Sequence, residues 1–196
     1  MGDPVLHLFV GPNGAGKTTL FQRVVEPVVG LPWINADEIA AAHVVADAYA
    51  ASRAAAEERQ AVIEAGRSFA TETVFSHLSK VELVRSAVEH GYLVTMHLVL
   101  VPVALAVARV EVRVENGGHD VPVDKTVARF ERLWPLVVEA IDLVREAYVY
   151  DNTSAAEPFR LVATFRGGRL VGEASLPTWA PVPLRDLVAR FDPDAR

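Results

Sequence analysis

The residues with the clearest chemical meaning form a phosphate-binding pattern near the N-terminus. Gly11, Gly16, Lys17 and Thr18 satisfy the spacing G-x-x-x-x-G-K-S/T. The glycines let the backbone turn its N–H groups inward, where they hold phosphate oxygens at the positive end of the following helix. The lysine reaches the β- and γ-phosphates of a nucleoside triphosphate, and the threonine hydroxyl helps to hold Mg²⁺.

The context of this loop favours a nucleotide site over a glycine-rich turn that matches by chance. An apolar strand pattern precedes the loop and a helical pattern follows it, as the motif requires. The sequence has neither the N-K-x-D stretch of GTPases nor the L-S-G-G-Q stretch of transporter ATPases, which leaves mainly small-molecule kinases. We expect ATP and Mg²⁺ as cofactors, with Thr18 as the metal-binding side chain. The expected ATP-binding residues are Gly11, Pro12, Asn13, Gly14, Ala15, Gly16, Lys17, Thr18, Thr19 and Asn152.

Two carboxylates, one directly after a predicted strand and one within a strand, are candidates for contact with the phosphate acceptor. Asp37 comes after the brief strand 32–35, where a carboxylate can take the proton of an attacking hydroxyl. It can also cap the helix that follows, and the two roles are compatible. Glu72 lies in an otherwise apolar strand, where an unpaired carboxylate is costly. It either binds substrate hydroxyls, with Thr73 beside it, or faces water at a sheet edge.

Four arginines surround a glycine-rich turn later in the chain. Arg109 and Arg113 are four residues apart and share one helical face, and Arg129 and Arg132 follow the turn. Guanidinium groups can neutralise the charge on a transferring phosphoryl group, so this helix–loop–helix predicts a lid. The alternative is a solvated face on which the arginines pair with nearby glutamates. We expect two of the four to act in catalysis.

Other polar residues in predicted loops carry weaker signals. Asn152, after Asp151 at the end of a strand, can contact the nucleotide base or simply form a turn. His77 and His119 are isolated histidines, which are more often bystanders than substrate contacts. No cluster of metal ligands is apparent beyond the Mg²⁺ expected with the nucleotide.

The alternation of strand and helix patterns predicts how these residues are positioned. Strands are expected at 5–10, 32–35, 68–75, 92–101 and 148–151, with a hairpin formed by 159–165 and 169–174. Helices are expected at 17–28, 37–65, 79–90, 102–115, 123–146 (with a kink at Pro135) and 183–191. This order predicts an α/β fold with a parallel sheet of the P-loop kinase kind, flanked by helices, with a helical arginine-bearing lid and a C-terminal hairpin. With no repeat or linker, we expect a single domain over residues 1–196.

Composition excludes several other classes. The formal charge is −6 and only three lysines occur, which argues against nucleic acid as a main partner. Cysteine is absent, so there is no disulfide framework and no thiolate site. We see no export signal and no apolar run long enough to cross a membrane. A cytoplasmic protein is the simplest interpretation.

Taken in order, several segments resemble the zeta toxin family of P-loop kinases in its short-chain branch. They are GPNGAGKTT, N-A-D-E-I, SFATETVFSH, RVENGGHDVP followed by ARFERLWPL, and YDNT, between Val5 and about Phe165. The resemblance implies phosphorylation of the sugar of UDP-N-acetylglucosamine with ATP and Mg²⁺, and an antitoxin protein as a possible partner. It implies catalytic roles for Lys17, Asp37, Arg113 and Arg129, and substrate binding by Asp37, Glu72 and Thr73.

Two other functions stay open on the sequence. One is a chloramphenicol-phosphotransferase-like or metabolic kinase that acts on another alcohol. The other is a nucleotide-gated module in which ATP controls binding to a protein partner. Transfer of phosphate to a small molecule would separate both kinases from the binding module.

Overall fold

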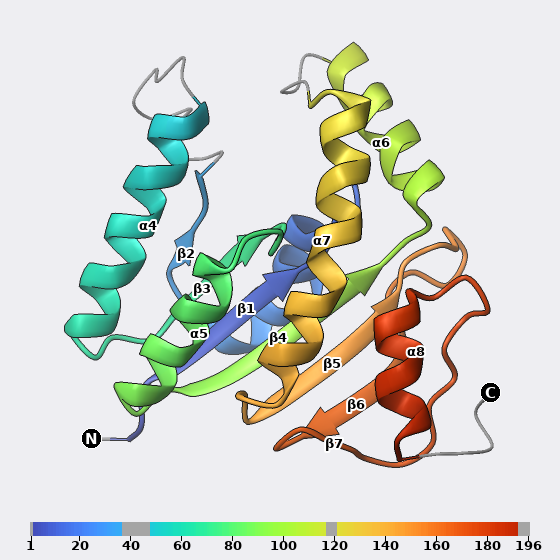
Figure 1. Cartoon of the computed structure of the whole chain (residues 1–196). Coiled ribbons are helices and arrows are strands. Elements are labelled where there is room, and N and C mark those ends of the chain that lie inside the picture. Colours follow the sequence, from blue (N-terminus) through green and yellow to red (C-terminus); the bar gives the residue numbers. More distant parts are fainter. Residues whose placement is uncertain (1, 37–47, 117–120, 192–196) are drawn as a thin grey trace.

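The computed structural model describes residues 2–36, 48–116 and 121–191 and is built on one seven-stranded sheet (Figure 1). The sheet order is β2-β3-β1-β4-β5-β6-β7, parallel from β2 to β5 and antiparallel beyond it. This confirms the predicted α/β fold and its C-terminal hairpin. The strands are β1 (Val5–Val10), β2 (Trp33–Ile34), β3 (Phe69–Thr73), β4 (Leu93–Leu100), β5 (Glu146–Asp151), β6 (Arg160–Arg166) and β7 (Arg169–Leu170).

The strand order creates a crevice at the carboxyl ends of β1 and β3. The chain leaves β1 toward β2 on one side of the sheet, and it leaves β3 toward β4 on the other side. Where connections diverge from neighbouring parallel strands, ligands bind outside the strand ends. In the register of this pair, Val10 lies opposite Thr73 and Phe9 lies opposite Glu72. The phosphate loop and the predicted substrate residues therefore share one edge of the sheet.

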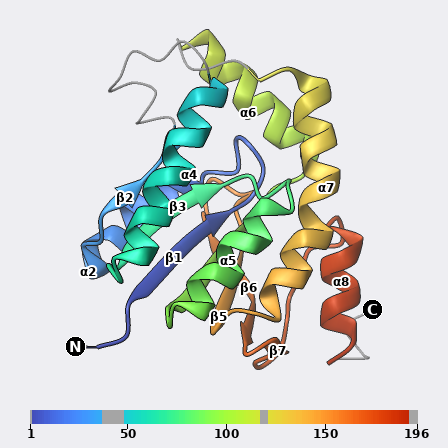
Figure 2. The same ribbon diagram turned by 60° about the vertical axis from the view of Figure 1, so that its left-hand side comes forward.

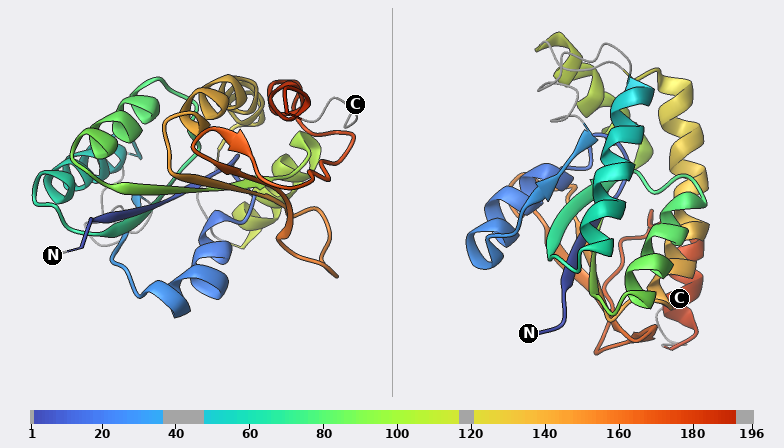
Figure 3. Two further views of the ribbon diagram at one scale, coloured as in Figure 1. Left: turned by 90° about the horizontal axis from the view of Figure 1, so that it is seen from below. Right: turned by 90° about the vertical axis from the view of Figure 1, so that its left-hand side faces the viewer.

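Helices cover the two faces of the sheet unequally (Figure 3). One face carries α4 (Ala48–Glu64), α5 (Ser79–Glu89), α7 (Val123–Ile141) and α8 (Val182–Ala189), and the larger apolar core lies beneath them. The other face carries α1 (Lys17–Leu20), the π-helical turn η1 (Phe21–Val25) and α2 (Glu26–Val29), which pack on a smaller core around Phe9. The helix α6 (Val103–Glu115) and the first half of α7 extend beyond the carboxyl ends of the strands, opposite α4 (Figure 1, Figure 2).

The helix predicted at 17–28 is not one regular helix. It contains η1, in which the N–H of Glu26 donates to the carbonyl of Phe21, five residues earlier. The cause is Pro27, which has no N–H to donate and whose ring clashes with the preceding turn of an α-helix. The segment ends at Gly30 in the left-handed conformation, with its N–H bonded to Glu26 O at 2.9 Å.

Two other predicted boundaries were wrong. The helix predicted at 123–146 ends at Ile141, because the segment from Glu146 onward pairs with β4 as the start of β5. Pro135 lies inside this helix. The second hairpin strand was predicted at 169–174 but pairs only over Arg169–Leu170. Of the helix predicted at 37–65, residues 37–47 lie outside the described part, and α4 accounts for the remainder.

Two further expectations concern the chain as a whole. Among the described residues, no helix is both long and apolar enough to cross a membrane. The single domain over residues 1–196 stays a prediction.

A buried histidine sits at the centre of the sheet. His97, in β4, is 4 % exposed, and its ring stacks on Phe9 with 4.5 Å between ring centroids. Its Nε2 lies 2.9 Å from Nδ1 of His7 in β1. Burial, and next the neighbouring His7, lower the pKa of His97 to about 3.

This histidine should make the fold sensitive to acid. The unfolded chain takes up a proton at His97 near its ordinary pKa of about 6.5, whereas the folded chain does not until about pH 3. As the pH is lowered from about 6.5 to about 3, the free energy of unfolding should therefore decrease. This group contributes at most about 1.4 kcal/mol per pH unit to the decrease. We expect His97→Gln to flatten the slope of unfolding free energy, measured by urea titration at several pH values. Exposed His90→Gln is the control, and equal slopes for wild type and His97→Gln would contradict the assignment.

Candidate active site

The phosphate loop joins β1 to α1 by a backbone that only glycine allows at two points. Gly14 has φ +76° and Gly16 has φ +96°, both in the left-handed region. A Cβ on Gly14 would lie 2.6 Å from Ala106 O, and one on Gly16 would lie 2.7 Å from Asn152 Nδ2. The loop therefore lies directly against α6 and against the segment after β5. Its N–H groups stand at the N-terminus of α1, as an anion site requires.

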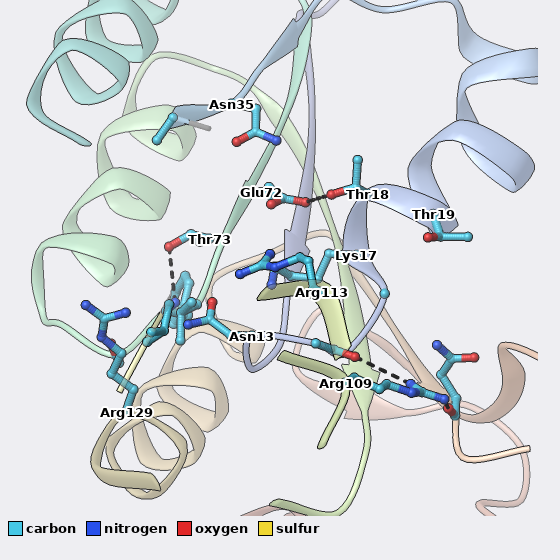
Figure 4. A pocket seen from close by; sticks show the side chains of 18 of the residues that line it. Asn13, Lys17, Thr18, Thr19, Asn35, Glu72, Thr73, Arg109, Arg113 and Arg129 are labelled. Atoms are coloured by element: carbon cyan, nitrogen blue, oxygen red, sulfur yellow. Dashed lines mark hydrogen bonds between the residues drawn. The ribbon is translucent and has the colours of Figure 1, made fainter. Parts of the chain in front are cut away.

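Asn152 and Arg109 support the loop from outside. The buried Asn152 donates from Nδ2 to Ala15 O at 2.8 Å. Arg109 donates from Nη2 to Asn152 O at 3.0 Å and from Nη1 to Gly14 O at 3.4 Å (Figure 4). These bonds tie α6, β5 and the loop together. The contact predicted between Asn152 and the nucleotide base stays a prediction, and the amide nitrogen already has a partner in the loop.

Lys17 and Thr18 stand where the motif places them. Lys17 is only 7 % exposed, and its Nζ donates to Pro12 O at 3.1 Å. Thr18 donates from Oγ1 to Glu72 Oε2 at 2.7 Å, across the junction of β1 and β3 (Figure 4). Because β3 lies between β2 and β1, the alternative that Glu72 occupies a sheet edge was wrong.

The hydroxyl and carboxylate oxygens of this pair suit Mg²⁺. A magnesium ion bound with a nucleotide takes one or two protein oxygens and completes its shell with phosphates and water. Thr18 and Glu72 supply such oxygens next to the phosphate loop. Within the described ranges, no cluster of three or more histidine and acidic side chains offers an alternative site.

The loop opens into a cavity of about 920 Å³ that is rich in cations. The acid that lines it, among the described residues, is Glu72. Thr73, Asn35 and His77 also line it. The lining cations are Lys17, Arg23, Arg59, Lys80, Arg109, Arg113, Lys125 and Arg129.

The four candidate arginines lie in different environments. Arg113 and Arg129 both line the cavity, from α6 and α7, and Arg113 points toward Lys17 (Figure 4). Arg109 lines it too but is held by backbone carbonyls of the loop. Arg132 is exposed and is not part of the cavity wall. The geometry is compatible with Arg113 and Arg129 as the catalytic pair, and that role stays a prediction.

Two predicted residues cannot be placed. Asp37 and His119 lie outside the described residues. Asn35, which follows β2, is 6 % exposed and lines the cavity, as does Ala36. The chain thus lines the cavity up to the residue directly before Asp37.

The backbone is strained at two points of the cavity wall. Phe75 (φ +61°) and Phe159 (φ +55°) have positive φ, and both line the cavity. Among the described residues other than glycine, they are the ones in this region. Such strain costs about 1–3 kcal/mol per residue and collects at functional sites. Phe75 lies two residues after the end of β3, and its N–H donates to Thr73 Oγ1 at 3.1 Å.

Sequence reasoning missed half of the cations in this cavity. Arg23, Arg59, Lys80 and Lys125 reach it from η1, α4, α5 and α7, which are distant in sequence. The relevant feature of the sequence is the scarcity of lysine: the chain has three, and all three line this cavity. Arginine serves as the cation everywhere else.

Comparison with known proteins identifies a matching family. The family model described as Zeta toxin matches residues 1–157. No curated protein sequence matches the chain.

Several solved structures share the fold. A chain of the AvrRxo1-ORF1:AvrRxo1-ORF2 complex is 16 % identical, with a TM-score of 0.67 over 87 % of this chain and 61 % of that one. A putative kinase from Chloroflexus aurantiacus is 18 % identical, with a TM-score of 0.62, 80 % and 92 % of the two chains being covered. The PezAT toxin–antitoxin system of Streptococcus pneumoniae is 15 % identical, with a TM-score of 0.63 and 97 % and 79 % coverage. This chain therefore spans less than two thirds of the AvrRxo1 chain that it matches.

The phosphate-loop lysine provides the first test of the site. We expect Lys17→Ala to reduce phosphate transfer on the order of a hundredfold or more, because it removes the charge that bridges the β- and γ-phosphates. The fold should persist, since the Lys17 side chain lines the ligand cavity, and its hydrogen bond to Pro12 O contributes only about 1 kcal/mol. Circular dichroism and a phosphate-transfer assay on one preparation would check both. Arg67→Ala, exposed and outside the cavity, is the control; near-normal transfer in folded Lys17→Ala would contradict the assignment.

Proposed function

Because the chain belongs to the zeta toxin family, we propose that it transfers the γ-phosphoryl group of ATP to a hydroxyl of UDP-N-acetylglucosamine or a related sugar. Family and fold together support the broader class, an ATP-dependent kinase of the P-loop type. The observation that carries the proposal is the shared cavity of about 920 Å³, into which the phosphate loop, Glu72 and Thr73 all open. Its volume lies at the upper end for small-molecule sites, which suits two ligands side by side.

The proposed roles follow from the positions of the described side chains and, for Asp37, from its place in the sequence and the family resemblance. The loop N–H groups and Lys17 hold the β- and γ-phosphates. The acceptor hydroxyl forms a bond to the γ-phosphorus, the bond to the bridging β–γ oxygen breaks, and ADP leaves. Asp37 takes the hydroxyl proton, while Arg113 and Arg129 neutralise charge on the transferring group. Mg²⁺, held through Thr18 and Glu72, supplies further charge neutralisation at the phosphates.

Glu72 and Thr73 are the proposed contacts for the acceptor. Their place at the end of β3 puts them beside the phosphate loop and opposite the end of β1. The Thr18 hydroxyl already donates to one Glu72 oxygen, and the other can accept from a sugar hydroxyl. A single carboxylate would then join the metal side and the acceptor side of the cavity.

A protein antitoxin is the proposed macromolecular partner. The PezAT structure is described as a toxin–antitoxin system, and the family match extends over most of this chain. Co-purification with the product of a neighbouring gene would test this partner directly.

An acceptor assay tests the activity. The protein, ATP and Mg²⁺ are incubated with UDP-N-acetylglucosamine, other nucleotide sugars, free sugars and chloramphenicol, and products are resolved by mass spectrometry. We expect a gain of one phosphate on UDP-N-acetylglucosamine or a close relative, and none with Lys17→Ala. A gain on chloramphenicol alone would favour the alternative kinase. No gain on any acceptor, with ATP bound, would leave the nucleotide-gated binding module.

Asp37→Asn tests the proposed base. Asparagine keeps the shape and much of the capping ability of aspartate, but it cannot take a proton. We expect turnover to fall on the order of a hundredfold or more while ATP affinity stays within a few fold. ATP titration and the sugar-kinase assay on one preparation would measure both.

The opposite outcome would give Asp37 a structural role only. A residue that merely caps a helix would change stability by less than about 1 kcal/mol in this substitution and would leave turnover unchanged. Unchanged turnover in Asp37→Asn would therefore exclude the base.

A further inference from the structure

Beyond the phosphate loop, the cavity contains a second pair of cations that has no role so far. Arg59 comes from the middle of α4 and Lys80 from the first turn of α5, and both line the cavity. Arg59 Nη1 donates to Thr71 Oγ1 at 3.4 Å, and that hydroxyl donates in turn to Ile34 O at 2.7 Å. Thr71 thus holds the guanidinium beside β3, on the sheet face that α4 covers. Thr71 lies two residues before Thr73 in the same strand. We call these two cations the Arg59–Lys80 pair.

Arg59 is buried and Lys80 is half-buried, and neither has an ion-pair partner in the described part of the chain. Arg59 is 4 % exposed, and its Nε has no hydrogen-bond partner there. Burial lowers the pKa of Arg59, and the attraction of the neighbouring Glu58 only partly offsets this effect. Burial lowers the pKa of Lys80, and Arg59 lowers it further, so the two charges lie close enough to repel each other. An arrangement of this kind is costly for folding alone.

The position of the pair separates it from the nucleotide phosphates. The phosphate loop follows β1 and packs against α6 through Gly14, while Arg59 and Lys80 belong to α4 and α5, on the opposite face of the sheet from α1. Glu72 and Thr73, the proposed acceptor contacts, stand at the end of β3, whose Thr71 anchors Arg59. The pair therefore borders the acceptor side of the cavity.

We propose that the Arg59–Lys80 pair is an anion subsite that binds a phosphate or diphosphate group of the acceptor. A guanidinium and an ammonium together suit phosphate oxygens, the first by its planar fork and the second as an adaptable point charge. The pair thereby selects phosphorylated acceptors over neutral alcohols. This inference rests on the proposed kinase function, and it adds the charge of the acceptor and the residues that recognise it.

The test is a binding experiment that needs no catalysis. The phosphate loop is first filled with Mg²⁺ and a non-hydrolysable ATP analogue, and UDP or inorganic pyrophosphate is then titrated by calorimetry. We expect saturable binding to wild type and at least tenfold weaker binding to Arg59→Gln and to Lys80→Gln. Arg85→Gln is the control: Arg85 also lies on α5, but it is exposed and pairs with Glu139 outside the cavity.

Two further measurements distinguish recognition from a structural role. Lys80→Arg keeps the charge and should bind UDP within a few fold of wild type. Lys80→Gln removes a repulsive charge, so the free protein should melt at the same or a higher temperature and lose the stabilisation that UDP gives to wild type. A lower melting temperature with unchanged UDP affinity would make Lys80 structural. Equal affinity of UDP for wild type and both glutamine variants, or no binding of either probe to wild type, would overturn the subsite.

Kinetics keeps this inference distinct from the kinase proposal. With UDP-N-acetylglucosamine as acceptor, Lys80→Gln should raise the KM for the acceptor at least tenfold and leave the KM for ATP unchanged. With neutral N-acetylglucosamine, wild type and variant should react equally. If no acceptor is phosphorylated, the kinase proposal fails while the calorimetric result still decides the subsite. If transfer occurs with an unchanged acceptor KM in both variants, only the subsite fails.

Discussion

The phosphate loop keeps its shape through direct contact of its backbone with segments far away in sequence. At Gly14 and Gly16 there is no room for a side-chain carbon, because Ala106 O and Asn152 Nδ2 would lie less than 3 Å from it. The close approach lets Arg109 and Asn152 donate to the loop carbonyls of Gly14 and Ala15, so these side chains compete for none of the loop N–H groups that can bind a ligand. α6, β5 and β1 are thereby joined at one point.

The charge distribution gives the cavity a potential opposite to that of the whole molecule. The chain has a formal charge of −6, yet the described wall of the cavity contains eight cations and one acid. Acidic residues elsewhere hinder anions from binding to the outer surface, while the low-dielectric walls focus the positive field inside. Without a bound ligand, the mutual repulsion of these cations opposes the folded state. Binding of a polyanion relieves that repulsion, so ligand and fold should stabilise each other.

The sequence predicted most of the fold and about half of the cavity wall. Hydrophobic periodicity located most of the described strands and helices, and it is most reliable for long, strongly patterned elements such as β4 and α6. It missed η1, where a single proline shifts the hydrogen bonds, and the start of β5, where pairing with β4 overrides helical propensity. The phosphate loop was predictable from the sequence, because its function requires contiguous residues. Arg59 and Lys80 were not, because only the packing of α4 and α5 on the sheet brings them together.

The larger core also explains how strained backbone can persist beside the cavity. Phe75 is fully buried in that core, although its φ of +61° is unfavourable for a bulky side chain. Burying a phenylalanine contributes about 2–3 kcal/mol, which is enough to offset a strain of about 1–3 kcal/mol. The anchored ring fixes the direction in which the chain leaves β3. Ser76 and His77 therefore line the cavity, and α5 begins where Lys80 can reach it. The strained conformation of Phe75 thus helps to place Lys80, one member of the Arg59–Lys80 pair, at the cavity.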